Sequence, residues 1–412
     1  MNLSPRTKGI VCAAVGLGGL CLTGAAAGDW PQWRGQNRNG VSAETGWLTT
    51  WPADGPKVAW KKNVGSGYSG VAVVGDRLYT AGNIEGFVKT ADVIYCLDVA
   101  DGKEIWKQSY DSAKGAYGGP RATPTVDGDC LFMLSRHGDL LCLAVTNGSV
   151  RWRKNVRADF GVGKEPHEWG LSCSPLVLGD RLILDLGKLL VLNKADGARL
   201  SSLGDDGPSF SSPFAFDLGG QPHVTSFNQF GLVLYNLTAN KEIGRAEWKA
   251  KYLANVATPV VDGGRIFISS GYGRGCALFQ ASPEGLKSLY ENTNLSSECI
   301  SGVLHQGCLY SVSGEQGNPG SLKCLDFATG QVKWEHAGFK VGGGLTIADG
   351  KILHLADNGQ LTLVAAAPDA YQELARAKVL GPNCWTQPVL ANGRVYCRNN
   401  KGDLVCLDVR GE

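Results

Sequence analysis

The chain has 412 residues, of which 43% are hydrophobic and 19% are charged, and its formal net charge is +2. This length can bury a large core. The balanced charge, without a basic stripe, argues against nucleic acid as a partner. The 57 glycines are about twice the usual frequency. Evenly spread glycines indicate many tight turns, which are typical of an all-β chain of short strands.

Residues 1–27 have the pattern of a secretory signal peptide. Arg6 and Lys8 precede an apolar stretch that ends in three alanines, Ala25–Ala27. The stretch has about 15 apolar residues whereas a bilayer span needs about 20, so a membrane anchor is the less favoured alternative. We expect cleavage before Gly28, a periplasmic or secreted protein, and no transmembrane span in the mature chain.

A repeated unit follows the signal peptide and a short N-terminal extension, residues 28–56. Its clearest copy, Ala122–Trp152, contains apolar strands separated by Asp-Gly or Asn-Gly turns and ends in a Trp. A period of about 40 to 50 residues with four short strands is typical of β-propeller blades. Eight copies begin near Gly70, Ala122, Cys173, Ser212, Ala257, Ser301, Gly343 and Thr386.

The eighth copy has three strands and lacks the outermost one. An orphan strand with a Trp at the matching place, Pro56–Val64, precedes the first copy. Because an open ring would expose two sheet edges, we expect this strand to pair with Leu404–Val409 and close the ring. The sequence thus predicts an all-β, eight-bladed propeller of four-stranded antiparallel blades over residues 57–412. Deleting the orphan strand should disrupt folding, whereas removing Asp29–Gly46 should do much less.

Two further segments are interpreted through the repeat. Asp369–Leu380 has helix-forming composition, but its place in the repeat predicts an outer strand. In the eighth copy, a two-residue turn at Lys401–Gly402 would place Cys397 opposite Cys406, where a cross-strand disulfide is possible. The alternative is two core thiols between blades. Eleven cysteines remain after the signal is removed, so at least one is unpaired within the chain.

The phrases "CLDVADGKEIW", Cys96–Trp106, and "CLDFATGQVKW", Cys324–Trp334, resemble the pyrroloquinoline-quinone (PQQ) repeat. That repeat builds the eight-bladed propellers of quinoprotein alcohol dehydrogenases and of the scaffold lipoprotein of the outer-membrane barrel-assembly machine. The segment "DWPQWRGQNRNG", Asp29–Gly40, resembles the N-terminus of exported propellers from planctomycete-type bacteria. The resemblance implies that one tryptophan per repeat packs between neighbouring blades: Trp60, Trp106, Trp152, Trp248 and Trp334.

The candidate site lies on one face of the expected ring, which we call the top face. It is formed by the loops that enter the innermost strands and by those that join the second strand to the third. These loops carry cations and aromatic residues that suit a protein, a glycan or an anionic small molecule, although a solvated rim would have the same composition. The tentative binding residues are Arg121, His167, Trp169, Arg274, Lys340 and Trp385.

The sequence leaves two functions open. We expect a monomeric, non-catalytic binding or scaffold module for a protein or glycan in the periplasm or envelope, with no catalytic residues, metal ligands or cofactor. The alternative is a PQQ- and calcium-dependent oxidoreductase of alcohols or sugars. Such an enzyme needs oxygen ligands for calcium, a carboxylate base and a stacked Trp. The large alcohol dehydrogenases also have adjacent cysteines, and this sequence has no Cys-Cys pair.

Overall fold

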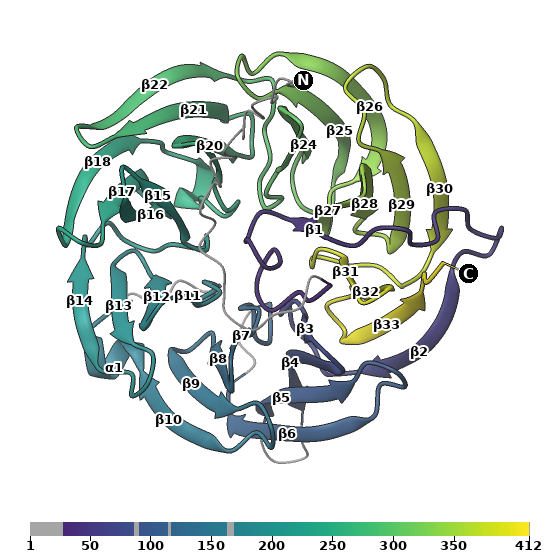
Figure 1. The fold of residues 1–412 in the computed structure, drawn as a ribbon, viewed down its shortest axis with the longest axis horizontal. Coiled ribbons are helices and arrows are strands. Elements are labelled where there is room, and N and C mark those ends of the chain that lie inside the picture. The colour runs from purple at the N-terminus through teal and green to yellow at the C-terminus, as the bar shows by residue number, and fades with distance from the viewer. Residues whose placement is uncertain (1–27, 86–89, 114–116, 163–168, 412) are drawn as a thin grey trace, which may run out of the picture.

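The structure is a ring of eight β-sheets around a central axis (Figure 1). It is a computed structural model that describes residues 28–85, 90–113, 117–162 and 169–411. Each sheet has four antiparallel strands, stacked one after another from the centre of the ring to its rim. One sheet gains a fifth, parallel strand from the N-terminal extension. The predicted eight-bladed, all-β propeller is confirmed.

The blades take their strands in chain order. The innermost strands are β3 (Ala72–Val74), β7 (Thr125–Asp127), β11 (Leu176–Leu178), β15 (Phe214–Leu218), β19 (Val260–Asp262), β23 (Val303–His305), β27 (Gly344–Ala348) and β31 (Val389–Ala391). The second strands are β4 (Arg77–Glu85), β8 (Cys130–Leu134), β12 (Arg181–Asp185), β16 (Gln221–Phe227), β20 (Arg265–Ser270), β24 (Cys308–Ser313), β28 (Lys351–Leu355) and β32 (Arg394–Arg398).

The third strands are β5 (Thr90–Asp98), β9 (Asp139–Ala144), β13 (Leu189–Asn193), β17 (Gly231–Asn236), β21 (Gly275–Ser282), β25 (Pro319–Asp326), β29 (Gln360–Ala365) and β33 (Asp403–Asp408). The outermost strands are β6 (Glu104–Asp111), β10 (Val150–Asn155), β14 (Arg199–Leu203), β18 (Lys241–Glu247), β22 (Gly285–Asn292), β26 (Val332–Lys340), β30 (Glu373–Lys378) and β2 (Lys57–Asn63). The extension supplies β1 (Val41–Ser42), and the connections contain α1 (Val156–Phe160) and η1 (Lys251–Leu253).

The ring closes as the sequence predicts. Strand β2 pairs antiparallel with β33, with Trp60 opposite Cys406, and so supplies the missing outer strand of the eighth blade. Figure 1 shows β2 beside the C-terminal end of the chain. The segment with helical composition is also a strand, β30, because its neighbour β29 needs an outer partner.

A tryptophan–glycine contact joins neighbouring blades and explains the repeated phrase. Four tryptophans donate their indole N–H to main-chain oxygens of the next blade over 2.8 to 3.1 Å: Trp60 to Val99, Trp106 to Val145, Trp152 to Lys194 and Trp334 to Ala367. The ring of Trp106 lies on Gly148, where a Cβ would approach Cε3 to 2.5 Å. The repeat therefore needs a glycine in this turn because the preceding blade's tryptophan fills the space of a side chain.

This contact gives a stability prediction with a matched control. Gly148 and Gly128 both have positive φ values, +72° and +58°, but no atom lies within 4 Å of a Cβ placed on Gly128. Gly128→Ala should cost about 1 kcal/mol from its left-handed backbone alone. Gly148→Ala should cost about 2 kcal/mol more because the new methyl group overpacks Trp106. Chemical denaturation checks the difference, and equal costs would contradict the contact.

Trp248 does not occupy the place predicted for it. It follows the end of β18, and Gly244 stands opposite Leu234, at the position where four other blades have their outer-strand tryptophan. The Trp248 ring is fully buried, and its Nε1 donates to Ser270 Oγ at 3.0 Å. The prediction for Trp248 is wrong because the repeat pattern shows only that a Trp ends the unit. It does not show where the β-bulge lies, and the bulge sets the register of the outer strand.

The disulfide considered between Cys397 and Cys406 is not formed. Asn399 N donates to Asp403 O at 3.1 Å, so three residues rather than two form the turn. This shifts the register by one, and Cys397 faces Val405 while Cys406 faces Tyr396. A one-residue shift sends the two side chains to opposite faces of the sheet. Both cysteines are buried free thiols, as in the alternative interpretation.

The N-terminal extension lies at the centre of the ring, where Figure 1 shows it in purple. The innermost strand of each blade presents unpaired main-chain groups to the centre, and the extension bonds to them. It contacts seven of the eight blades, through Val73, Val126, Ser174, Thr258, Ser301, Ile347 and Leu390.

Two buried arginines of the extension span the centre. Arg34 donates to the carbonyl oxygens of Ser301 and Gly302 in the sixth blade, at 3.1 and 2.6 Å. Arg38 donates in the third blade to Pro175 O and Ser174 O, at 2.9 and 3.1 Å. Desolvation by burial lowers the pKa of Arg34 to about 9 and that of Arg38 to about 10. Both remain charged at neutral pH, and main-chain oxygens stabilise them.

Candidate functional site

Five of the predicted binding residues, Arg121, Trp169, Arg274, Lys340 and Trp385, lie on the top face. The opposite face holds the ends of the central segment. On the opposite face, Asp29 Oδ1 accepts from Gly75 N at 2.9 Å, and Glu44 accepts from the main chain of Asn392 and Gly393. Gly75, Asn392 and Gly393 lie in turns between first and second strands. A partner that approaches from the top face therefore meets loops of the blades themselves.

An aromatic group on the top face joins the eighth, first and second blades. We call Tyr68, Tyr117, Arg121 and Trp385 the Trp385 cluster. The rings of Tyr68 and Trp385 stack at a centroid distance of 5.1 Å, and Tyr117 lies 6.4 Å from Trp385. The Arg121 guanidinium lies 5.2 Å from the Tyr68 ring centre, within cation–π range. The loops that enter three successive blades thus build one aromatic and cationic surface.

Main-chain and side-chain bonds hold this cluster in place. Trp385 Nε1 donates to Asp357 Oδ1 at 2.7 Å, and Asp357 N donates to Lys340 O at 3.3 Å. Arg121 donates to the carbonyl oxygens of Tyr117 and Gly119, at 3.0 and 3.2 Å. Burial, and secondarily the charge of Arg136, lower the pKa of Arg121 to about 10. The structure thus brings three predicted residues, Arg121, Lys340 and Trp385, into one neighbourhood.

A second group lies on the top face of the fifth blade. We call Lys251, Tyr252, Leu253 and Tyr272 the Tyr272 cluster. The two tyrosine rings meet edge to face at 5.3 Å, and Lys251 Nζ lies 5.1 and 5.0 Å from their centres. The Tyr272 hydroxyl donates to Glu298 Oε1 at 3.0 Å, and the main-chain N–H of Tyr272 donates to Glu315 Oε1. This loop therefore holds its aromatic side chains in a fixed arrangement.

Arg274 and Trp169 form contacts outside the two clusters. The Arg274 guanidinium lies 3.3 Å above the Trp248 ring and forms a 2.8 Å ion pair with Glu291, so its charge is already compensated. Trp169 packs against Phe210 at a centroid distance of 5.3 Å. His167 lies outside the described residues.

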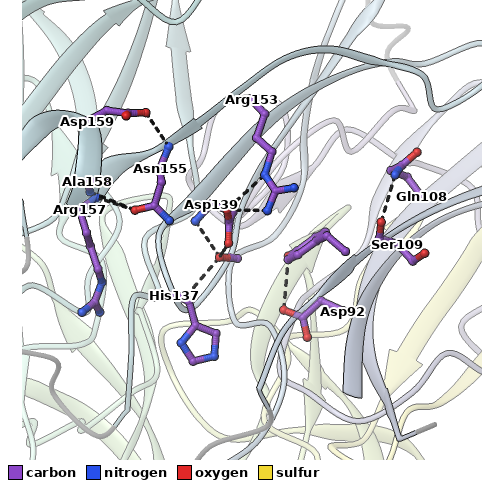
Figure 2. Close-up of polar contacts among 12 residues, drawn as sticks. Asp92, Gln108, Ser109, His137, Asp139, Arg153, Asn155, Arg157, Ala158 and Asp159 are labelled. Carbon is purple, nitrogen blue, oxygen red and sulfur yellow. Dashed lines mark hydrogen bonds and ion pairs between the residues drawn. The ribbon is translucent and has the colours of Figure 1, made fainter. Parts of the chain in front are cut away.

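Between the first two blades, the acidic side chains near the top face already have partners (Figure 2). Asp92 accepts from Asn83 Nδ2 at 2.8 Å and from the Tyr110 hydroxyl at 3.3 Å. Asp139 accepts from Arg153 at 2.7 Å. Burial raises the pKa of Asp92 above its usual value. The adjacent loop is held by Ser135, whose Oγ accepts from the main-chain N–H groups of His137 and Asp139, at 3.2 and 2.8 Å.

Sequence reasoning missed three aromatic residues of the clusters: Tyr68, Tyr117 and Tyr252. All three lie in the loops that enter an innermost strand, one of the two classes of loop from which the other candidates were taken. Tyr117 and Tyr252 are 55% and 58% exposed, so hydrophobic patterning does not place them in a core. An aromatic residue in such a glycine-rich or polar loop was the signal that could have found them.

The described residues do not fit a calcium-bound quinone. They contain no group of three or more His, Cys, Asp or Glu side chains able to hold a metal ion. The centre of the ring is filled by the extension, with Trp30, Arg34 and Arg38 buried. Among the described residues, no helix is long and apolar enough to cross a membrane.

Comparisons with known proteins agree with this architecture. BamB from Moraxella catarrhalis is 15% identical with a TM-score of 0.61, and the match covers 85% of this chain and 98% of that one. Quinohemoprotein alcohol dehydrogenase from Comamonas testosteroni is 12% identical with a TM-score of 0.67, covering 94% and 82%. A europium-containing methanol dehydrogenase is also 12% identical with a TM-score of 0.67, covering 93% and 90%. At these identities the likeness shows the fold.

Sequence comparison shows the family. No curated protein matches the chain. The family model described as outer membrane protein assembly factor BamB matches residues 44–224 and 89–336, which together span more than half of the sequence. The chain therefore belongs to the family of PQQ-like repeat propellers that this BamB model describes.

Proposed function

We propose that this protein is an exported, non-catalytic scaffold that holds a protein partner on its top face in the periplasm or envelope. The observation that carries the proposal is the strained main-chain conformation of three exposed tyrosines on the top face. Tyr117, Tyr252 and Tyr272 have φ values of 49°, 59° and 57°, in the left-handed region that side chains rarely adopt. Each such residue costs about 1 to 3 kcal/mol, and such strain clusters at functional sites.

The composition of the two clusters favours a protein partner. Trp, Tyr and Arg dominate binding energy at protein interfaces because they combine a large apolar surface with a polar group. Both clusters lie on one face but belong to blades on different sides of the ring, so a partner that covers both must be broad. The family's description as an assembly factor also supports an interaction role.

Single substitutions on the top face should weaken partner binding without changing stability. We expect Trp385→Ala, Tyr117→Ala or Tyr252→Ala to lower the affinity about 30-fold or more, as hot-spot truncation costs about 2 kcal/mol. Leu200→Ala is the matched control, because Leu200 is 55% exposed and lies near the opposite face. Titration calorimetry with the purified partner and thermal melting of each variant measure both quantities.

Other outcomes would contradict the proposal. Binding that survives all three top-face substitutions would exclude this face. Binding to a glycan array that the same substitutions abolish would keep the face but replace the protein partner with a glycan. Dye reduction with alcohols or sugars that depends on added PQQ and calcium would show an oxidoreductase instead.

A further inference from the structure

The first described residue, Gly28, lies against two acceptor oxygens on the opposite face. A Cβ placed on Gly28 would stand 2.6 Å from both Glu44 Oε1 and Asn392 Oδ1. The amide nitrogen and a Cβ are both bonded to Cα and lie about 2.5 Å apart. The nitrogen of Gly28 is therefore no more than about 5 Å from either oxygen.

The Glu44 carboxylate has capacity for a cation. Its oxygens accept from Asn392 N at 2.6 Å and from Gly393 N at 3.2 Å, which fixes it at the turn between β31 and β32. A carboxylate has about four acceptor positions, so these two bonds leave room for further donors. Within the described part of the chain, no lysine or arginine forms an ion pair with Glu44.

We propose that cleavage of the Ala27–Gly28 bond creates an α-ammonium group that binds Glu44 and Asn392, and that these two residues form a seat for the mature N-terminus. Hydrolysis of this bond adds one water, leaves a carboxylate on Ala27 and gives Gly28 an amine. Because a free α-amine has a pKa of about 7.7 to 8.0, it is largely protonated at neutral pH. This inference rests on the export that is part of the proposed function.

The seat explains why the mature chain would begin with glycine. A side chain at this position would displace the two side-chain oxygens that receive the ammonium group. The seat also lies where the extension starts to connect two blades. Asn392 belongs to the eighth blade, whereas the next two residues, Asp29 and Trp30, bond to Gly75 and Val73 of the first blade. The cleavage would thus complete the attachment of the extension beside the closure of the ring.

Chains with defined N-termini test the seat without relying on export. One chain begins at Gly28 after removal of a cleavable tag, and a second begins with one additional residue, Ala27; each is also made with Glu44→Gln. The α-amine is acetylated with N-hydroxysuccinimidyl acetate, and mass spectrometry follows the modified N-terminal peptide. We expect the folded Gly28 chain to react at least tenfold more slowly than the same amine after unfolding. Glu44→Gln, or the additional Ala27, should remove most of this protection.

Melting temperature provides the second readout. The Gly28 chain should melt about 2 °C above the Ala27 chain, in the range expected for one added ionic contact in a domain of this size. The difference should vanish when both chains carry Glu44→Gln. Equal acetylation rates and equal melting temperatures in all four chains would overturn the seat. If the intact mass of the secreted protein places its N-terminus elsewhere, the proposed cleavage site is wrong. The acetylation and melting results do not depend on whether the top face binds a partner, so the two proposals can fail separately.

Discussion

Deleting Asp29–Gly46 is expected to abolish the cooperative unfolding of the ring. The deletion removes Arg34 and Arg38, which together satisfy main-chain oxygens in the third and sixth blades, and the pairing of β1 with β27. Each buried acceptor left without a donor costs about 1 to 3 kcal/mol, so the loss is more than about 5 kcal/mol in total. Calorimetry and circular dichroism of the shortened chain measure the change.

A single substitution isolates the buried charge. Arg34→Ala should lower the free energy of unfolding by about 3 to 5 kcal/mol, because it leaves main-chain acceptors such as Ser301 O and Gly302 O buried without a donor. The control is Arg151→Ala, because Arg151 forms a surface ion pair with Asp129 that contributes less than about 1 kcal/mol. If the shortened chain unfolds cooperatively at nearly the wild-type temperature, the central segment has no role in holding the blades.

Removing Lys57–Asn63 should have a comparable effect from the rim of the ring. The deletion exposes the edge of β33 and removes Trp60, whose ring lies on Gly102 of the first blade and whose Nε1 donates to Val99 O. The eighth and first blades then lose this outer contact and keep the inner one, in which Arg398 donates to Ser69 O and Ala81 O. We expect aggregation or broad, non-cooperative melting, because an unpaired edge is a template for further strand pairing.

Two single substitutions in β2 test the same contact without a deletion. Trp60→Ala should lower the free energy of unfolding by about 3 to 5 kcal/mol, as other core aromatic truncations do. Val58→Ala should change it by less than about 0.5 kcal/mol, because the Val58 side chain is 44% exposed. Urea denaturation compares them, and similar losses from both would indicate that β2 is bound only through its main chain.

Much of the fold followed from the sequence because each repeat encodes its own contacts. The Gly148 turn and Trp106 recur at fixed spacing, so strand number, blade number and closure could be counted. The central segment could not be predicted in this way, since it occurs once and its bonds reach seven distant blades. The sequence alone led to the expectation that its removal matters little, whereas the burial of Arg34 and Arg38 leads us to predict the opposite.

The register between strands could not be predicted reliably from the sequence either. The turn before β33 has one more residue than expected, which separates Cys397 from Cys406. On the top face, Arg121 and Trp385 were predicted individually, but their contact through Tyr68 depends on three loops from separate repeats. Such contacts follow from the closed ring and have no counterpart in local spacing. The strained conformation of Tyr252 also has no sequence pattern that would predict it.

Site-specific photocrosslinking in the exporting cell tests most directly whether the top face holds a protein partner. A benzophenone amino acid would replace Tyr117 or Tyr252 on the top face, and Leu200 or Val150 near the opposite face; all four side chains are exposed. We predict that the same envelope protein is crosslinked from both top-face positions and from neither control, and that adding Trp385→Ala removes the adduct. Equal crosslinking from Leu200 and Val150, or none from Tyr117 and Tyr252, would contradict the account.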